Sequence, residues 1–245
     1  MDYEDVVLTE LVMWKRKMKR SPSLTNALAK KLQTRINTII PEKIHKFFTE
    51  AIRNMTEAVC LGAEYTSPPP MGETTLEVRE ALVKERIKFY RNTATAEGAI
   101  TGAGGILLGL ADFPLWLALK MKMLFEIAAL YGRDVSDYKE RLFLLHIFEL
   151  TFSSAKNRAQ VFEKIENWEQ YSRRLPDNVK SFDWRTFQQE YRDYIDLAKL
   201  LQLVPGIGAA VGAVVNHRLT EKLGNTAMNA FRLRLHDSLK LPGIP

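Results

Sequence analysis

The sequence predicts an all-α protein, a helical bundle of roughly eight to ten helices around two glycine-rich apolar helical hairpins that are related by a pseudo-repeat. Apolar residues recur at spacings of three and four along most of the chain, and no segment sustains the alternation of a half-buried strand. The composition, 46% hydrophobic and 26% charged over 245 residues, is typical of a globular protein with a sizeable core. We therefore expect helices packed on helices.

The first quarter of the chain predicts three amphipathic helices. Residues 3–20 carry an apolar stripe that consists of Val7, Leu11, Trp14 and Met18. A second helix is expected from the cap Ser21 to Pro41. The apolar face of the third helix is Ile44, Phe48, Ile52, Met55 and Val59. Gly62 is placed to end this third helix.

A proline-rich stretch then divides the chain. Residues 67–75 include three consecutive prolines and interrupt the helical pattern more clearly than any other segment. We expect basic amphipathic helices over 1–66, a linker over 67–75 and a helical core over 76–245, with the two helical parts packed as one unit.

The core region predicts further helices in order. A helix capped by Thr75 or Thr74 leads into the first glycine-rich segment, and its apolar face is Val83, Ile87 and Tyr90. A long apolar helix over 114–131 ends at Gly132, and further helices follow Ser136 and Asp183. The last helix follows the second glycine-rich segment, and its apolar face is Leu219, Leu223, Ala227, Ala230 and Phe231.

Two glycine-rich segments, 102–112 and 206–216, match each other in pattern. Glycine costs roughly 0.5–1 kcal/mol relative to alanine inside a helix, so its repeated use indicates close packing or a lipid environment. The candidate close-packing glycines are Gly98, Gly102, Gly105, Gly109, Gly208 and Gly212. Membrane-spanning helices, shallow membrane insertion and a soluble helical core all stay open. A dinucleotide loop is excluded because Leu107 and Val211 replace its third glycine, and no Walker lysine follows Gly109.

The segment 11–41 contains no acidic residue and eight basic ones. These are Lys15, Arg16, Lys17, Lys19, Arg20, Lys30, Lys31 and Arg35. Such an excess attracts polyanions, for example the anionic cytoplasmic leaflet, where each nearby Lys or Arg is worth about 1 kcal/mol. No nucleic-acid recognition module accompanies it, so we favour an anionic membrane surface or lipid over nucleic acid. The alternative is an ordinary solvated helix face.

Three polar residues mark the ends of the glycine-rich segments. Asp112 and Asn216 could meet in a small polar or ligand site with His217, or each could cap the following helix. His146 and Glu149 are three residues apart and could join His217 around a metal, but zinc needs three or four convergent ligands. A buried histidine with one polar partner is the simpler interpretation. We expect no metal, no cofactor and no catalytic residue.

Three motifs of the chain resemble those of the EcsC family. They are the run 102–105 closing in Asp112-Phe113-Pro114, the helix end at 127–132, and residues 204–209 leading to Asn216. That family takes its name from a product encoded beside the ATPase and membrane subunits of an ABC transporter in bacilli. The resemblance implies a bacterial protein, cytoplasmic or membrane-associated, linked to an ABC transporter or to secretion. It transfers no catalytic residue.

We therefore expect a non-enzymatic accessory protein, peripheral to the inner face of the cell membrane. The single cysteine, Cys60, and an N-terminus without the pattern of a signal peptide favour the cytoplasm. Two other classes stay open. One is a soluble helical protein that binds a lipid or another hydrophobic ligand, and the other is an enzyme with a polar site near Asp112 and Asn216.

Overall fold

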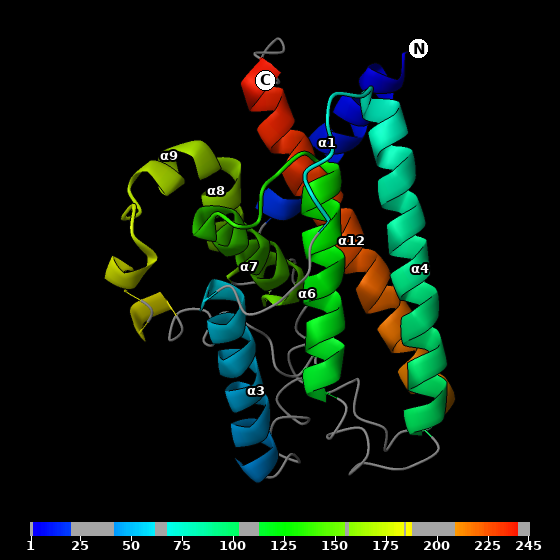
Figure 1. The fold of residues 1–245 in the computed structure, drawn as a ribbon. Helices are drawn as coiled ribbons and strands as arrows, with labels where there is room; N and C mark the ends of the chain where they lie inside the picture. The colour runs from blue at the N-terminus through cyan, green and yellow to red at the C-terminus, as the bar shows by residue number, and fades with distance from the viewer. Residues whose placement is uncertain are drawn as a thin grey trace.

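The computed structural model describes residues 2–20, 42–61, 68–102, 113–154, 157–183, 185–187 and 209–239. Every regular element in these ranges is helical and none of them is a strand, which confirms the all-α class (Figure 1). In chain order the elements are α1 (Tyr3–Lys19), α3 (Glu42–Leu61), α4 (Leu76–Gly102), α6 (Phe113–Leu130), α7 (Tyr138–Phe152), α8 (Arg158–Glu166), α9 (Trp168–Arg173), the short 3-10 helix η1 (Val179–Ser181) and α12 (Ala209–Leu239).

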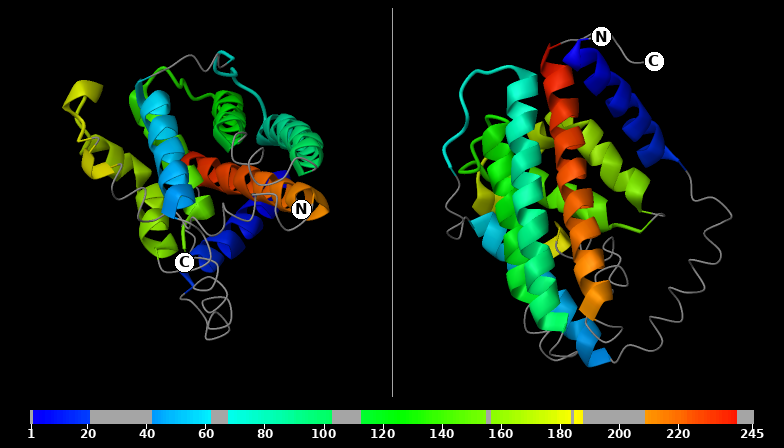
Figure 2. Two further views of the ribbon diagram at one scale, coloured as in Figure 1. Left: turned by 90° about the horizontal axis from the view of Figure 1, so that it is seen from below. Right: turned by 90° about the vertical axis from the view of Figure 1, so that its right-hand side faces the viewer.

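Three long helices, α4, α6 and α12, lie side by side and pack on one another (Figure 1, Figure 2). Gly224 of α12 faces Ile87 of α4 in a close contact. A Cβ atom on Gly224 would lie only 2.5 Å from Cγ1 of Ile87, so the helices could not keep this distance with a larger residue there. Glycine at position 224 thus permits a close contact between the two helices, and the glycine pattern of the sequence did not predict a role for this position.

Helix α7 lies in the interior of the molecule. Its residues from Arg141 to Phe152 are all buried, so the helix is covered on every side. Asp137 begins it by accepting a hydrogen bond from the backbone N–H of Lys139. Aromatic rings surround it, among them Trp168 against Phe143. A helix that is apolar around its circumference is expected in such a central position.

The predicted apolar faces of the other helices are largely confirmed among the described side chains, with Trp14 of α1 and Leu219 of α12 only partly buried. On α1 the buried residues are Val7, Leu11 and Met18. The buried face of α3 is Phe48, Ile52, Met55 and Val59, and that of α4 includes Val83, Ile87 and Tyr90. Gly132 ends the segment after α6 with a φ of 73°, a conformation that favours glycine. Helix α1 packs on α8 and α12.

The glycine-rich segments are described in part. Gly98 and Gly102 lie in the last turns of α4, and Gly212 lies in α12, whereas Gly105, Gly109 and Gly208 lie outside the described residues. The suggestion that Asn216 caps a following helix is wrong, because Asn216 lies well inside α12. The hairpin arrangement and the division at residues 67–75 stay predictions. Among the described helices, we find none whose length and hydropathy would suit a membrane crossing.

Candidate anion-binding site

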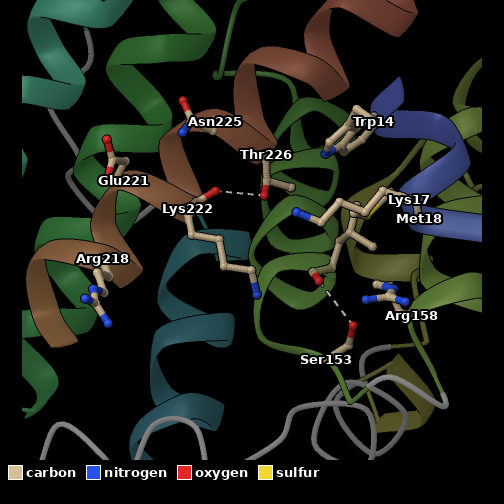
Figure 3. A pocket seen from close by; sticks show the side chains of 11 residues that line it. Trp14, Lys17, Met18, Ser153, Arg158, Arg218, Glu221, Lys222, Asn225 and Thr226 are labelled. Carbon is tan, nitrogen blue, oxygen red and sulfur yellow. Dashed lines mark hydrogen bonds between the residues drawn. The ribbon is translucent and has the colours of Figure 1, made fainter. Parts of the chain in front are cut away.

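A pocket of about 340 Å³ opens where four helices meet (Figure 3). Trp14, Lys17 and Met18 come from α1, and Leu150 and Ser153 come from the end of α7. Arg158, at the start of α8, forms another part of the wall. The residues from α12 are Arg218, Glu221, Lys222, Asn225 and Thr226. The volume lies within the range of small-molecule sites, roughly 300–1,000 Å³.

The pocket has a strong excess of positive charge. Four of its lining side chains are basic, and Glu221 is the one carboxylate among them. That carboxylate already pairs with Arg91 outside the lining, where Nη1 lies 3.1 Å from Oε1. Its charge is therefore partly offset by a cation that does not line the pocket. An anion entering the pocket would meet cations with little competition.

The basic side chains are held in different ways. Arg158 donates from Nη2 to the backbone oxygen of Arg20 at 3.1 Å, while its buried Nε has no hydrogen-bond partner within the described structure. Lys222 donates from Nζ to the backbone oxygen of Thr151 in the last turn of α7, where a positive charge is favourable. Figure 3 shows Lys17 extending from α1 and Lys222 from α12 toward the space between these helices.

The hydroxyl groups of the pocket are already engaged as donors. Ser153 donates to the backbone oxygen of Leu150 at 3.2 Å, and Thr226 donates to that of Lys222 at 2.8 Å. Trp14 and Met18 add an apolar wall, with Trp14 packed edge-on against Phe162 at 5.3 Å between ring centroids. An anion in this pocket would therefore be held by charged groups rather than by hydroxyls.

The predicted basic face of α1 divides into two parts. Lys15 and Lys19 both pair with Glu166, at 3.1 and 2.9 Å, and are therefore partly neutralised. Arg16, Lys17 and Arg20 are exposed, and Lys17 reaches the pocket. The other predicted bases, Lys30, Lys31 and Arg35, lie outside the described residues.

Sequence reasoning missed the three cations that α8 and α12 contribute to this pocket. Arg218 and Lys222 are four residues apart on one helix, a spacing that places both on one face and could have indicated a basic surface. No signal in the sequence joins that face to Arg158, because their meeting depends on how α1, α7, α8 and α12 pack.

The EcsC protein family matches residues 5–235, nearly the whole length of the sequence. The chain belongs to the EcsC family. This EcsC-family chain is 46% identical over 231 residues to Protein EcsC of Bacillus subtilis (strain 168), covering 94% of this chain and 95% of that protein. It is 33% identical over 160 residues to Uncharacterized protein YdbA of the same organism, covering 64% of this chain and 57% of that protein. No solved structure matches it significantly.

Asn216 joins two helices of the EcsC-family chain. Its Oδ1 accepts a hydrogen bond from Nε1 of Trp116 on α6 at 2.6 Å, and both residues are buried. The hydroxyl of Thr220 donates to the backbone oxygen of Asn216 at 2.8 Å. Asp112 lies outside the described residues, so the proposed pairing of Asp112 with Asn216 and His217 stays a prediction. What the structure supports is a structural bond between α6 and α12.

We expect Asn216→Leu to lower the free energy of unfolding by about 1 to 2 kcal/mol, because it leaves the buried indole N–H of Trp116 without this acceptor. Urea denaturation followed by circular dichroism measures the loss. Trp116→Phe in the Asn216→Leu background removes the stranded donor, so the penalty for Asn216→Leu should be smaller there. An Asn216→Leu variant as stable as the parent would contradict the structural role.

The EcsC-family chain buries a histidine beside a carboxylate. Nδ1 of His146 lies 2.8 Å from Oε2 of Glu149, and both side chains are 1% exposed. Rings of Trp168, Tyr171 and Phe187 surround the imidazole. In the part of the chain that is described, no group of three or more His, Cys, Asp or Glu side chains could hold a metal. The geometry of the pair is that of a histidine with one polar partner, while Nε2 of His146 has no hydrogen-bond partner among the described residues.

A second buried polar cluster centres on Glu80, which is fully buried in α4. Arg232 of α12 donates to both of its oxygens, at 2.7 and 2.6 Å. The hydroxyls of Tyr3 and Tyr131 donate to the same carboxylate at 2.6 and 3.2 Å. Four donors saturate the two carboxylate oxygens, so no acceptor capacity is left for a substrate. The cluster ties α1, α4 and α12 together.

The electrostatics of this cluster follow from its contacts. Burial alone raises the pKa of the Glu80 carboxyl, but the hydrogen bonds from Arg232, Tyr3 and Tyr131 outweigh it and hold that pKa below its ordinary value of 4.5. Burial and the adjacent Glu80 carboxylate raise the pKa of Tyr3 to about 12. The lowered pKa keeps Glu80 ionised and the raised pKa keeps Tyr3 protonated. These are the charge states in which the hydroxyl of Tyr3 donates to the carboxylate of Glu80.

Proposed function

We propose that this EcsC-family chain is a non-enzymatic accessory protein of the cytoplasmic membrane face, which binds anionic lipid through the outer face of α1 and the pocket beside it. The observation that carries the proposal is the concentration of cations there with little negative charge to oppose them. Each Lys or Arg near an anionic bilayer contributes about 1 kcal/mol. The link with an ABC transporter, which the family resemblance implies, is part of the same proposal.

The outer face of α1 has the composition of a helix that lies at a membrane surface. Val6 and Met13 are 40% and 58% exposed, and they lie seven residues apart on one face. Arg20 follows at the same interval, and Arg16 and Lys17 flank this line. Glu10 lies between Val6 and Met13 on this face and pairs with Arg232, so the bases gather around Met13 at the C-terminal half of α1. An exposed apolar side chain beside bases is typical of interfacial helices, in which apolar groups enter the headgroup region and bases bind anionic lipid.

Flotation with lipid vesicles tests this proposal. We expect the protein to float with phosphatidylcholine vesicles that contain phosphatidylglycerol at low salt, and to dissociate at high salt because screening weakens the attraction. Pure phosphatidylcholine vesicles should bind far less. Absence of binding to the anionic vesicles at low salt would overturn the proposal.

A charge-reversed variant locates the surface. Replacing Arg16, Lys17 and Arg20 by Glu should lower the affinity for phosphatidylglycerol vesicles by about 100-fold or more, from roughly 1 kcal/mol for each base removed. The matched control is the same change at three exposed bases near α9 and η1, Arg173, Arg174 and Lys180. It alters the net charge equally and should weaken binding much less. Equal losses in both variants would mean that only net charge matters.

A further inference from the structure

We propose that the pocket between α1, α7, α8 and α12 is a site for a phosphomonoester group. The inference rests on the proposed function only for the source of that group, which is either the headgroup of a phosphatidate-type lipid or a free phosphate compound. The chemistry is the same in both cases. A terminal phosphate carries close to two negative charges at neutral pH and three strong acceptor oxygens.

The charge of the pocket fits a dianion better than a monoanion. Lys17, Arg158, Arg218 and Lys222 line it, and the carboxylate of Glu221 pairs with Arg91 at 3.1 Å. Among the described residues, neither Lys17 nor Arg218 has an ion-pair partner. A dianion would balance the charges of these two side chains, whereas a monoanion would balance only one of them.

The donors of the pocket also fit phosphate. Two of its cations are arginines, whose planar guanidinium groups match phosphate oxygens with paired N–H donors. The buried Nε of Arg158 has no hydrogen-bond partner in the described part of the chain, so a donor is available inside the protein. A buried N–H without a partner costs free energy, and a guanidinium that turns this N–H toward a bound anion would remove that cost.

The remaining wall accommodates what the phosphate is attached to. Trp14, Met18 and Leu150 form an apolar side of the pocket, and Asn225 adds an amide. A phosphate esterified to a small organic group would place its charge among the cations and its carbon atoms on the apolar side. Inorganic phosphate alone should bind more weakly than such an ester.

Calorimetric titration of the full-length chain tests the site with three probes: inorganic phosphate, glycerol 3-phosphate and the diester glycerophosphoglycerol. We expect glycerol 3-phosphate to bind tightest, and the diester at least ten-fold more weakly. The affinity for glycerol 3-phosphate should rise from pH 5 to pH 7.5, because the second proton of a phosphomonoester dissociates near pH 6. Equal affinities for monoester and diester would overturn the inference.

Two double variants test whether binding depends on the pocket or only on the net charge of the protein. Lys17→Gln combined with Arg218→Gln should lower the affinity for glycerol 3-phosphate at least ten-fold, and both side chains are exposed, so folding should be unaffected. The control Arg173→Gln with Arg174→Gln removes the same charge elsewhere and should leave binding unchanged. If the control weakens binding equally, the pocket is not the site.

Vesicles then distinguish the two sources. If the site takes a lipid headgroup, the protein should bind phosphatidate vesicles more tightly than phosphatidylglycerol vesicles of equal charge. The variant with Lys17→Gln and Arg218→Gln should lose this preference. Binding of glycerol 3-phosphate without any phosphatidate preference supports the site with a free compound as its ligand. Flotation on phosphatidylglycerol without any binding of glycerol 3-phosphate overturns this inference and leaves the proposed function standing.

Discussion

Gly224→Ala should destabilise the protein by about 2 kcal/mol, although alanine is the better helix former. Its Cβ would lie 2.5, 2.7 and 2.9 Å from Cγ1, Cδ1 and Cγ2 of Ile87. These atoms belong to both branches of a β-branched side chain, so no single rotation moves all of them away. Overpacking a core typically costs 1–3 kcal/mol and occasionally more, which exceeds the gain of roughly 1 kcal/mol in helix propensity.

Variants of Ile87 make the mechanism testable by urea denaturation. Ile87→Val keeps both Cγ atoms, so Gly224→Ala should remain destabilising in that background. Ile87→Ala removes all three close atoms, and there Gly224→Ala should become neutral or stabilising. Gly72→Ala is a control for a glycine beside open space, because a Cβ at Gly72 would meet nothing within 4 Å, although Gly72 lies outside the helices and gains no helix propensity. A Gly224→Ala variant more stable than the parent would show that α4 and α12 do not meet as described.

The contrast between Gly224 and the predicted glycines indicates where sequence reasoning stops. Dense glycines such as Gly98 and Gly102 stand out because several lie close together in an apolar segment. Gly224 is a single glycine inside a strongly periodic helix, and its importance depends on Ile87 of another helix. Periodicity predicts which face of a helix is buried, but not which residue of a distant helix lies opposite.

Asn216 shows how a local preference can mislead. Asn is a preferred helix cap, and its place after an apolar segment suggested that role. In the structure it lies inside α12, because its side chain accepts from Trp116 of another helix and the backbone continues through it. Tertiary packing here overrides a local preference.

The candidate site was predictable only in part. The bases of α1 stand out in sequence because residues 11–41 lack acidic neighbours. Arg158 and Arg218 come from separate helices and come close to Lys17 only when α1 packs on α8 and α12.

The buried position of Glu80 could have been predicted from the sequence, since Glu80 lies on the same face of α4 as the buried Val83 and Ile87. An acid on an apolar stripe predicts a buried partner.

Glu80→Gln should lower the free energy of unfolding by about 3–5 kcal/mol, the usual cost of leaving one member of a buried ion pair without the other. The guanidinium of Arg232 is 4% exposed and would lose the charge that offsets its burial. The control is Glu10→Gln, which removes the other carboxylate on Arg232. Glu10 is 52% exposed, so its contribution should be about 1 kcal/mol or less.

Replacing both Glu80 and Arg232 tests whether these two residues stabilise the protein as a pair. In the Glu80→Leu background, Arg232→Met removes the unpaired charge and should recover much of the lost stability, since apolar replacements of buried ion pairs are often neutral. If Arg232→Met were as damaging in that background as in the parent, the two residues would not act as a pair. Double-mutant cycles on the free energy of unfolding measure this coupling.

The pH dependence of stability follows from the direction of each pKa shift. The pKa of Glu80 is lowered on folding, so its stabilisation is fully present above pH 4.5 and is lost as the pH falls through the lower pKa of the folded state. The advantage of the parent over Glu80→Gln should therefore shrink below pH 4.5. The contribution of Tyr3 is instead lost at high pH, because the pKa of its hydroxyl rises from 10.0 to about 12 on folding. The advantage of the parent over Tyr3→Phe should persist up to pH 10 and disappear as the pH rises through 12. An advantage that does not change in either range would mean that the Glu80 cluster does not contribute to stability through its charges.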